Sequence, residues 1–382
     1  MTKLQSLRCV LAVCVFCVAL AIASQAQTFT TLWNFDGNNG AQPGFGPLTQ
    51  GTDGNLYGTT KAGGIYNLGT VFKMTPAGTL TTIYTFCFQN RCPDGAQPEA
   101  GLLLGTDGNF YGTTYSGGTL GQGTVFKITP SGVLTVLHSF NIRDGANPYA
   151  RLVQGADGNF YGTALGGTHG NGTIFKITYG GRLTMLHSFN SSDGHPLDPL
   201  LQAPDGNFYG TTYGGAEDYG RIFKMTPSGT VSTLYSFCSE VGCTDGTAPS
   251  AGLVLGNDGN FYGTTQFNGA TGYGTVFKVT PGGTLTTLHT FDASDGADPY
   301  ATMIQATDGN LYGTTAVWGA NNYGTIFQIT PSGTFTTLYN FCSVSGCDDG
   351  KSPVRSFYWV PTATCTAKPQ VAGPMAAVRF SA

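Results

Sequence analysis

The sequence predicts an all-β protein with the architecture of a β-propeller. One phrase recurs seven times at a period of about 50 residues, as TFTTLWNF, TLTTIYTF, VLTVLHSF, RLTMLHSF, TVSTLYSF, TLTTLHTF and TFTTLYNF. Repeats of this length are supersecondary units that bury a core by packing on their neighbours. Glycine accounts for 58 of 382 residues, only 10% of residues are charged, and turn formers occupy fixed places in the period. This pattern favours many short strands over disorder.

Each period contains four segments that we expect to form strands. In the second complete repeat they are Gly101 to Leu104, Phe110 to Thr114, Thr124 to Thr129 and Leu134 to Phe140. Asp107-Gly108-Asn109 and Pro130-Ser131-Gly132 separate them as turns, because Pro presets φ and Gly accepts positive φ. Four antiparallel strands in about 50 residues match the size of a propeller blade. A β-solenoid is the alternative, but its coils are usually shorter.

The order of the segments indicates how the ring closes. The chain reaches its first fourth-strand phrase at Thr28, with no first three strands before it. Six complete units follow, ending at Phe341, and their turn aspartates are Asp53, Asp107, Asp157, Asp205, Asp258 and Asp308. The sequence thus predicts six complete blades plus the N-terminal strand of a seventh. The other three strands of that blade should follow Pro353.

The segment after Pro353 does not carry the repeat in this reading frame. Reverse translation of residues 357–360, read two bases later, forces Leu-Leu-Gly, and the next codons permit Thr-Asp-Gly-Asn-Leu-Tyr-Gly. The shifted Asp falls at Pro361 and a shifted Thr at Val378, 17 residues apart, as are Asp107 and Thr124. We infer a frameshift near the start of this segment, with a genuine irregular tail as the alternative.

The chain is expected to divide into a signal peptide at 1–26, a repeat β-propeller domain at 27–353 and an irregular, frameshifted seventh repeat at 354–382. From Leu7 to Ala23 the sequence is apolar apart from Arg8, and the small residues Ser24 and Ala26 follow as in a cleavage site. An uncleaved anchor is the alternative, but the apolar stretch is short for a span of about 20 residues.

Charge and export limit the expected partners. Removal of Lys3 and Arg8 with the signal peptide changes the formal charge from −4 to −6. Such a chain neutralises few phosphates, so we expect no nucleic acid partner. We expect an exported protein, periplasmic, extracellular or at the cell surface, that meets a membrane only through an anchor absent from this chain. No cofactor or metal site is expected.

The recurring phrases GTDGN(L/F)YGTT, GTVFK(M/I/V)TP and TLTTL(Y/H)(T/S)F resemble the Gloeo/Verruco-type tandem repeat of the choice-of-anchor exported bacterial proteins. The resemblance covers residues 28–353 in six consecutive units. Departures are single substitutions at Ala164, Tyr179, Arg221 and Gln328. The resemblance implies export and a repeat architecture, with a surface anchor that this chain does not show. It implies no defined activity.

Three cysteine pairs are expected to form disulfides: Cys87 with Cys92, Cys238 with Cys243, and Cys342 with Cys347. Each pair lies where the step from the fourth-strand Phe to the next Asp-Gly is eight residues, whereas the step is four in the connections without cysteines. A disulfide would staple the longer loop in an oxidising compartment. Zinc would need four ligands, and each loop offers two.

The recurring polar and aromatic residues are expected to be structural. The turn aspartates should cap their own backbone, because one carboxylate per turn is too few for calcium. One lysine recurs in the third strand of five units: Lys73, Lys127, Lys176, Lys224 and Lys278. These lysines should pair with the turn aspartates. The alternative is that they form a ring of cations that holds an anionic sugar. Histidines that alternate with Tyr should pack rather than act as bases: His138, His187 and His289. One tyrosine per repeat should pack between blades: Tyr57, Tyr111, Tyr161, Tyr209, Tyr262 and Tyr312.

Function is expected in the loops, where the repeats differ. The leading hypothesis is a non-catalytic exported or cell-surface scaffold that binds an extracellular protein or polysaccharide through its loop faces. The binding candidates are Trp318, Asn321 and Asn322, since a Trp beside amides suits sugar stacking, although Trp318 could equally fill a gap at the rim. Other variable loops lie at 66–68, 120–122 and 217–218.

Two alternatives stay open. The first is an enzyme in the central funnel, such as a lyase, a hydrolase or a quinoprotein-like oxidoreductase, and the second is a decayed, non-functional product. An enzyme should carry non-repeated acid, base or metal-ligating residues at inward positions, and the sequence shows no catalytic set. In the chain as given, we expect the closing strands to be missing and the unpaired sheet edges to reduce stability.

The frameshift hypothesis makes a prediction about the gene. Sequencing of genomic DNA and transcript across codons 345–382 and several hundred bases downstream should reveal a one-base difference near codon 354. Translation of the corrected frame should then restore the seventh repeat. An unchanged sequence with a stop after codon 382 would contradict the hypothesis.

Overall fold

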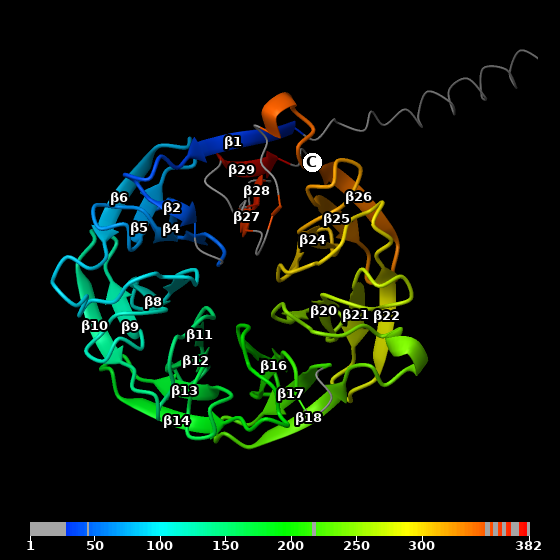
Figure 1. Cartoon of the computed structure of the whole chain (residues 1–382), viewed down its shortest axis with the longest axis horizontal. Helices are drawn as coiled ribbons and strands as arrows, with labels where there is room; N and C mark the ends of the chain where they lie inside the picture. Colours follow the sequence, from blue (N-terminus) through cyan, green and yellow to red (C-terminus); the bar gives the residue numbers. More distant parts are fainter. Residues whose placement is uncertain are drawn as a thin grey trace, which may run out of the picture.

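A computed structural model describes residues 28–43, 46–215, 219–347, 352–353, 358–360, 364–367 and 374–379. Its sheets are arranged radially around a central axis (Figure 1). The β-propeller prediction is therefore confirmed, and the β-solenoid alternative is wrong. The only helical elements among the described residues are two short 3-10 turns, η1 (Val241–Cys243) and η2 (Ser345–Cys347). No helix in this part of the chain is long and apolar enough to cross a bilayer. The predicted signal peptide lies outside the described residues.

Six blades each contain four antiparallel strands, ordered from the axis outward. The first three blades comprise β3 (Thr49–Gln50), β4 (Leu56–Ala62), β5 (Thr70–Met74) and β6 (Leu80–Thr85); β7 (Leu103–Leu104), β8 (Phe110–Thr114), β9 (Thr124–Ile128) and β10 (Leu134–Ser139); and β11 (Val153–Gln154), β12 (Phe160–Ala164), β13 (Thr173–Ile177) and β14 (Leu183–Ser188). The short strand β2 (Ala41–Pro43) also pairs with β4.

The next three blades repeat this order. They comprise β15 (Leu201–Gln202), β16 (Phe208–Thr212), β17 (Arg221–Met225) and β18 (Val231–Ser236); β19 (Val254–Leu255), β20 (Phe261–Thr265), β21 (Thr275–Val279) and β22 (Leu285–Thr290); and β23 (Ile304–Gln305), β24 (Leu311–Thr315), β25 (Thr325–Ile329) and β26 (Phe335–Asn340). The second strand of each blade is buried on both faces, whereas the outer strand is only partly buried. The core therefore lies between the blades.

A seventh sheet closes the ring. The N-terminal strand β1 (Thr28–Asn34) pairs with β29 (Pro374–Arg379), which pairs with β28 (Thr364–Ala367) and then β27 (Tyr358–Val360). The contribution of an N-terminal strand to a seventh blade was predicted correctly. The expectation that its three partner strands are missing was wrong, because backbone pairing does not require the side chains of the repeat phrase.

The closing strands lie close to where a shifted frame would place the repeat. Strand β28 begins three residues after Pro361, and β8 begins three residues after Asp107. Pro361 itself lies outside the described residues. The frameshift concerns the gene, so it stays a prediction.

Aromatic stacking joins neighbouring blades. The tyrosine in the second strand of one blade stacks on the first residue of the same strand in the next blade. Ring centroids are 4.1 Å apart for Tyr57 with Phe110, 4.0 Å for Tyr111 with Phe160, 4.1 Å for Tyr161 with Phe208, and 4.3 Å for Tyr209 with Phe261. Such pairs add to the burial of both rings. The predicted packing between blades is confirmed for these four tyrosines.

The same tyrosines anchor the turns. The Tyr111 hydroxyl donates to Asp107 Oδ2 at 2.8 Å, and Asn109 donates to both Asp107 oxygens from its backbone N and its Nδ2. Burial raises the pKa of Asp107, but the hydrogen bonds from Asn109 and Tyr111 outweigh burial and lower the pKa overall. The turn role of the six aspartates is thereby confirmed, since the equivalent bonds occur in every complete blade.

Removal of one tyrosine hydroxyl tests this contact. We expect Tyr111→Phe to lower the free energy of unfolding by about 1 kcal/mol, because the ring keeps its stacking while the hydrogen bond to Asp107 is lost. Urea denaturation measures the change. Tyr66→Phe is the control, because Tyr66 is exposed and lies in a loop. Equal stability of Tyr111→Phe and the wild type would contradict the anchoring role.

Candidate functional site

The recurring lysines do not form a ring around the central channel. They lie in the third strand from the axis, and three of them pair with the turn aspartate of their own blade. The Nζ to Oδ2 distances are 3.5 Å for Lys73 with Asp53, 3.9 Å for Lys176 with Asp157, and 3.0 Å for Lys224 with Asp205. The structure thus confirms aspartate pairing for these three, and a cation ring around the channel is excluded by their position.

The alternating His and Tyr of the outer strand hold the connection to the next blade. His138 Nε2 lies 3.2 Å from Asp144 Oδ2, and the Tyr84 hydroxyl donates to Asp94 Oδ2 at 2.9 Å. His289 and Asp295 form a matching pair at 2.8 Å. The predicted aromatic packing is also present, for example between His138 and Phe140.

Sequence reasoning missed these contacts to aspartate, although a signal was available. His occurs wherever the connection is short, and Tyr occurs in the connections that are longer by four residues and carry cysteines. The side chain of the outer strand therefore changes with the length of the loop that it must hold. Both residue types orient a loop, and Tyr84 also lines an open pocket of about 370 Å³ together with Phe88 and Asp94.

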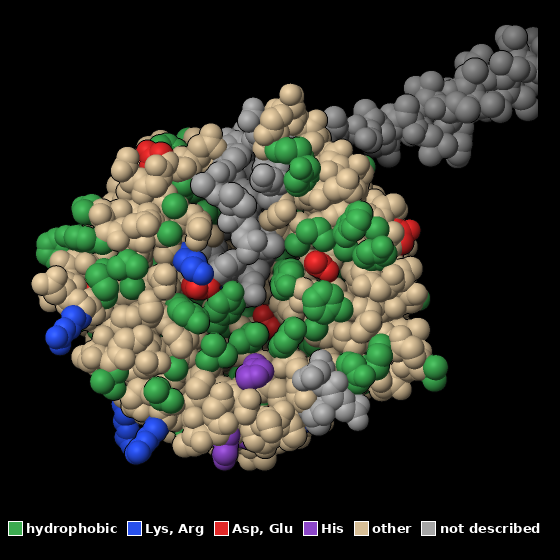
Figure 2. All heavy atoms as spheres, in the orientation of Figure 1, with side chains coloured by type: hydrophobic (Ala, Val, Ile, Leu, Met, Phe, Trp, Pro, Cys, Tyr) green, Lys and Arg blue, Asp and Glu red, His purple; other side chains and the backbone are tan. Residues whose placement is uncertain are grey.

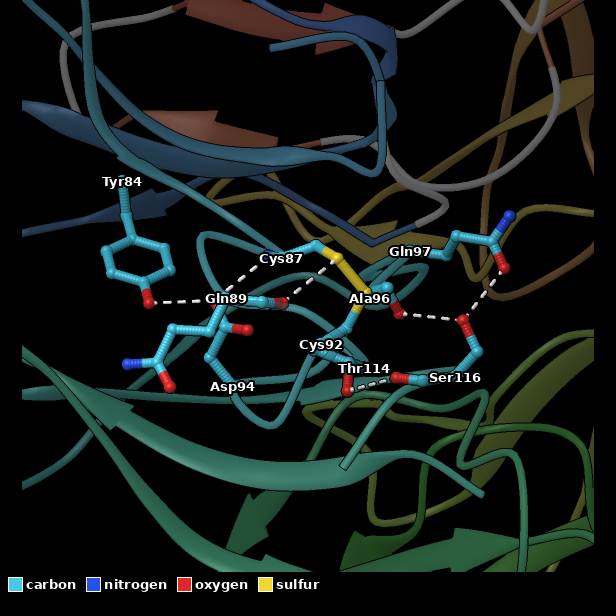
Figure 3. The surroundings of a disulfide bond; sticks show 9 residues. All are labelled: Tyr84, Cys87, Gln89, Cys92, Asp94, Ala96, Gln97, Thr114 and Ser116. Atoms are coloured by element: carbon cyan, nitrogen blue, oxygen red, sulfur yellow. Dashed lines mark hydrogen bonds between the residues drawn. A yellow bond between two sulfur atoms is a disulfide. The ribbon is translucent and has the colours of Figure 1, made fainter. Parts of the chain in front are cut away.

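The three predicted disulfides are present: Cys87–Cys92, Cys238–Cys243 and Cys342–Cys347. Figure 3 shows the first of them above the loop that Tyr84 and Asp94 hold. Asp94 also accepts from the backbone N of Cys87 at 2.9 Å. Disulfide and carboxylate thus fix one loop together, which excludes a zinc role for these cysteines.

Residues from five blades meet at the axis around a cavity of about 30 Å³, which is the space of about one water molecule. Its lining includes Arg151, Asp198, Tyr149, Tyr300 and Thr302. The Arg151 guanidinium donates from Nε to the carbonyl of Leu102 at 2.9 Å and so spans two blades. A sugar ring does not fit into this space.

The charged residues near the axis break the repeat symmetry, and sequence reasoning missed them. Asp198 is 6% exposed and stands where the other five complete blades have Gly46, Ala100, Ala150, Ala251 and Ala301. Glu99, also buried, pairs with Lys61 at 2.8 Å. An alignment on the proline before each inner strand would have found both acids.

Trp318 has an unusual backbone. It follows the second strand of the last complete blade and has a φ of 62°. The same position in the other blades is held by residues that tolerate positive φ: Gly63, Gly117, Gly166, Gly214 and Asn268. The loop requires this conformation, because the backbone N of Gly324 donates to the carbonyl of Trp318, as Gly123 does to Gly117. A bulky residue here is strained by roughly 1–2 kcal/mol.

The indole of Trp318 is 45% exposed and lies edge-on to Tyr273 of the preceding blade, with ring centroids 6.2 Å apart. Tyr323, in the same loop, is also exposed. Asn321 donates from Nδ2 to the carbonyl of Phe341 at 3.0 Å and thus helps to hold the loop. Asn322 has a φ of 64° and forms the turn. Of the three binding candidates, Trp318 is therefore the one that presents a large surface.

Other variable loops also expose apolar side chains. Tyr66, in the first blade, and Phe88, in the connection to the second blade, are both exposed and form an edge-on pair. Leu120 is exposed in a loop of the second blade. Figure 2 shows hydrophobic side chains around the centre of one face and over the sector of β20, β21, β24 and β25, with few charged groups between them. The loop at 217–218 lies outside the described residues.

Comparison with known proteins gives a family. A profile described as the Gloeobacter/Verrucomicrobia repeat matches residues 17–201 and 166–358. This agrees with the resemblance seen in the recurring phrases. No curated protein matches the chain.

Several solved structures share the fold. The extracellular domain of a candidate one-component system from B. thetaiotaomicron aligns with a TM-score of 0.61 at 10% identity, over 94% of this chain and 40% of that one. A candidate 6-phosphogluconolactonase from Bacteroides fragilis gives 0.53 at 18%, over 82% and 94%. The periplasmic gluconolactonase of Pseudomonas aeruginosa gives 0.50 at 18%, over 87% and 95%. At these identities the similarity concerns the fold alone.

Removal of one disulfide tests its contribution. We expect the double variant Cys238→Ser/Cys243→Ser to lose about 2 kcal/mol of unfolding free energy, the small value expected for a short closed loop. Chemical denaturation with and without dithiothreitol measures it. Dithiothreitol should lower the unfolding free energy of the wild type by more than that of the variant, because the wild type has three disulfides to lose and the variant has two. A wild type that is insensitive to reductant would contradict a stabilising role.

Proposed function

Because the chain belongs to the Gloeobacter/Verrucomicrobia repeat family, we propose that it is an exported, non-catalytic scaffold that binds a polysaccharide through the loops of its last two complete blades. The proposed contact surface, called the aromatic platform below, consists of Trp318 and Tyr273. The ring of Trp318 is exposed, and Tyr273 beside it is half-buried against the core. Aromatic rings suit the apolar faces of sugars, and their stiff side chains lose little conformational entropy on binding. Three disulfides support export, because such bonds persist in oxidising compartments.

The observation that carries this proposal is the strained backbone of Trp318. Backbone strain in a bulky residue persists only where the surrounding structure over-determines it, and it clusters at ligand sites. Glycine at four equivalent positions fulfils the same structural task without strain. Gap filling alone therefore explains Trp318 poorly, since almost half of its surface faces solvent.

One observation favours the enzyme alternative, namely the non-repeated Arg151 and Asp198 at the axis. Against it, the cavity there has room for about one water molecule, and Arg151 is engaged with Leu102. A search for products released from any bound polysaccharide separates the two proposals. Turnover that Asp198→Asn abolishes would favour the enzyme.

The variant Trp318→Gly separates ligand binding from structure. We expect its unfolding free energy to be the same as that of the wild type or higher by up to about 1 kcal/mol, because glycine adopts the left-handed conformation without strain. Its affinity for the polysaccharide should fall at least tenfold, or about 1.4 kcal/mol. Affinity electrophoresis against cellulose derivatives, xylan, galactomannan and mixed-linkage glucan measures binding, and urea denaturation measures stability.

Tyr66→Ala is the matched control, because Tyr66 has a similar exposure, 43%, in a loop of the first blade. It should bind as the wild type does. A Trp318→Gly variant that is clearly destabilised but binds normally would show that Trp318 is a packing residue. Binding that is lost equally in both variants would place the contact elsewhere on the loop face.

A further inference from the structure

The residue before the proline that leads into each inner strand has a left-handed backbone in five complete blades. These residues are Gln42, Gln97, Asn147, Ala248 and Asp298, with φ between 48° and 56°. Asp298, in the connection to the last complete blade, is the only carboxylate among them. Five of the six complete blades thus share a backbone conformation at this position, while the side chain differs.

In two other blades the side chain at this position has a structural role. Gln97 Oε1 accepts from the Ser116 hydroxyl at 3.0 Å, a contact that Figure 3 shows beside the first disulfide. Asn147 Nδ2 donates to the carbonyl of Tyr115 at 2.8 Å. Both bonds tie the connection to a neighbouring loop.

Asp298 makes neither of these contacts. The residue equivalent to Ser116 in its blade is Val317, which has no hydroxyl. A carboxylate cannot donate to a backbone carbonyl, so the bond that Asn147 makes is also closed to it. Within the part of the chain that the structure describes, the carboxylate of Asp298 has no hydrogen-bond or ion-pair partner. Its burial raises its pKa, as expected for a carboxyl group with no compensating donor.

The backbone of Asp298 lies between the two loops that carry the aromatic platform. Its N–H donates to the carbonyl of Tyr273 at 3.3 Å, and its carbonyl accepts from Ala316 at 3.0 Å, two residues before Trp318. The neighbouring residue Ala297 pairs with Val317. The unpartnered carboxylate is therefore fixed to the same backbone as Tyr273 and Trp318.

We propose that Asp298 accepts hydrogen bonds from the hydroxyl groups of a neutral glycan that stacks on the aromatic platform. The inference rests on the proposed function and adds the class of ligand. A carboxylate accepts strongly from hydroxyls and repels the carboxylates of a uronic acid polymer. The site therefore selects neutral polysaccharides over acidic ones.

The test compares Asp298→Asn and Asp298→Ala in the full chain. Binding of xylan and galactomannan, as neutral probes, and of polygalacturonate, as an acidic one, is measured by affinity electrophoresis. We expect at least a tenfold loss of affinity for the neutral probe that the wild type binds, and a smaller preference for it over polygalacturonate in Asp298→Asn. Asn147→Asp is the matched control: it should lose stability, because it loses a structural donor, but keep the affinity of the wild type.

The outcomes separate this inference from the proposed function. If both Asp298 variants bind as the wild type while Trp318→Gly does not, the role of Asp298 is refuted and the aromatic platform stands. If the wild type prefers polygalacturonate, the selection for neutral glycans is refuted. If the wild type binds no probe, both proposals fail. Urea denaturation shows whether the variants are folded, and Asp298→Asn, which nearly preserves the shape of the side chain, keeps the test valid if Asp298→Ala is unstable.

Discussion

The structure depends on one tyrosine per blade, whose ring and hydroxyl do different work. The ring of Tyr111 stacks on Phe160 of the next blade, while its hydroxyl holds the Asp107 turn of its own blade. Packing between blades and the geometry within each blade are thereby coupled through a single side chain. Because this arrangement recurs, most repeated polar groups are engaged in structural bonds. Differences between blades can therefore accumulate only in the loops and at the axis without loss of the ring.

The length of each connection between blades imposes a second constraint, because it decides which side chain of the outer strand can hold the loop. A short connection is held by His138 through Asp144, and a longer one by Tyr84 through Asp94 together with a disulfide. The longer loop has more conformational freedom to lose on folding, and a disulfide reduces that freedom in the unfolded chain. The exchange of His for Tyr and the presence of cysteines are thus two parts of one adaptation to loop length.

The repeat made most of the fold predictable, since each feature occurs six times. The four strands, the aspartate turns and the stacking of Tyr57 could be read from the phrases, and the cysteine pairs from the spacing of their loops. The closing sheet was predicted wrongly, because strands β27–β29 pair through their backbone in a segment without the phrase. The set around Asp198 was missed because its members are far apart in the sequence and meet only at the axis. No residue pattern announces the left-handed backbone of Trp318, which is visible only once its loop is aligned with those of the other blades.

The repeat offers an internal reference that folds without repeats lack, because equivalent positions can be compared between blades. At the position of Trp318 the other blades show what the loop requires, namely a residue that accepts positive φ. At the position of Asp298 two other blades have side chains that bond to the protein, Gln97 and Asn147. Both residues depart from that requirement within one blade, and both departures cost stability by ordinary physical rules. Two neighbouring departures that each weaken the structure are difficult to explain by packing. A common ligand that contacts both side chains explains them together.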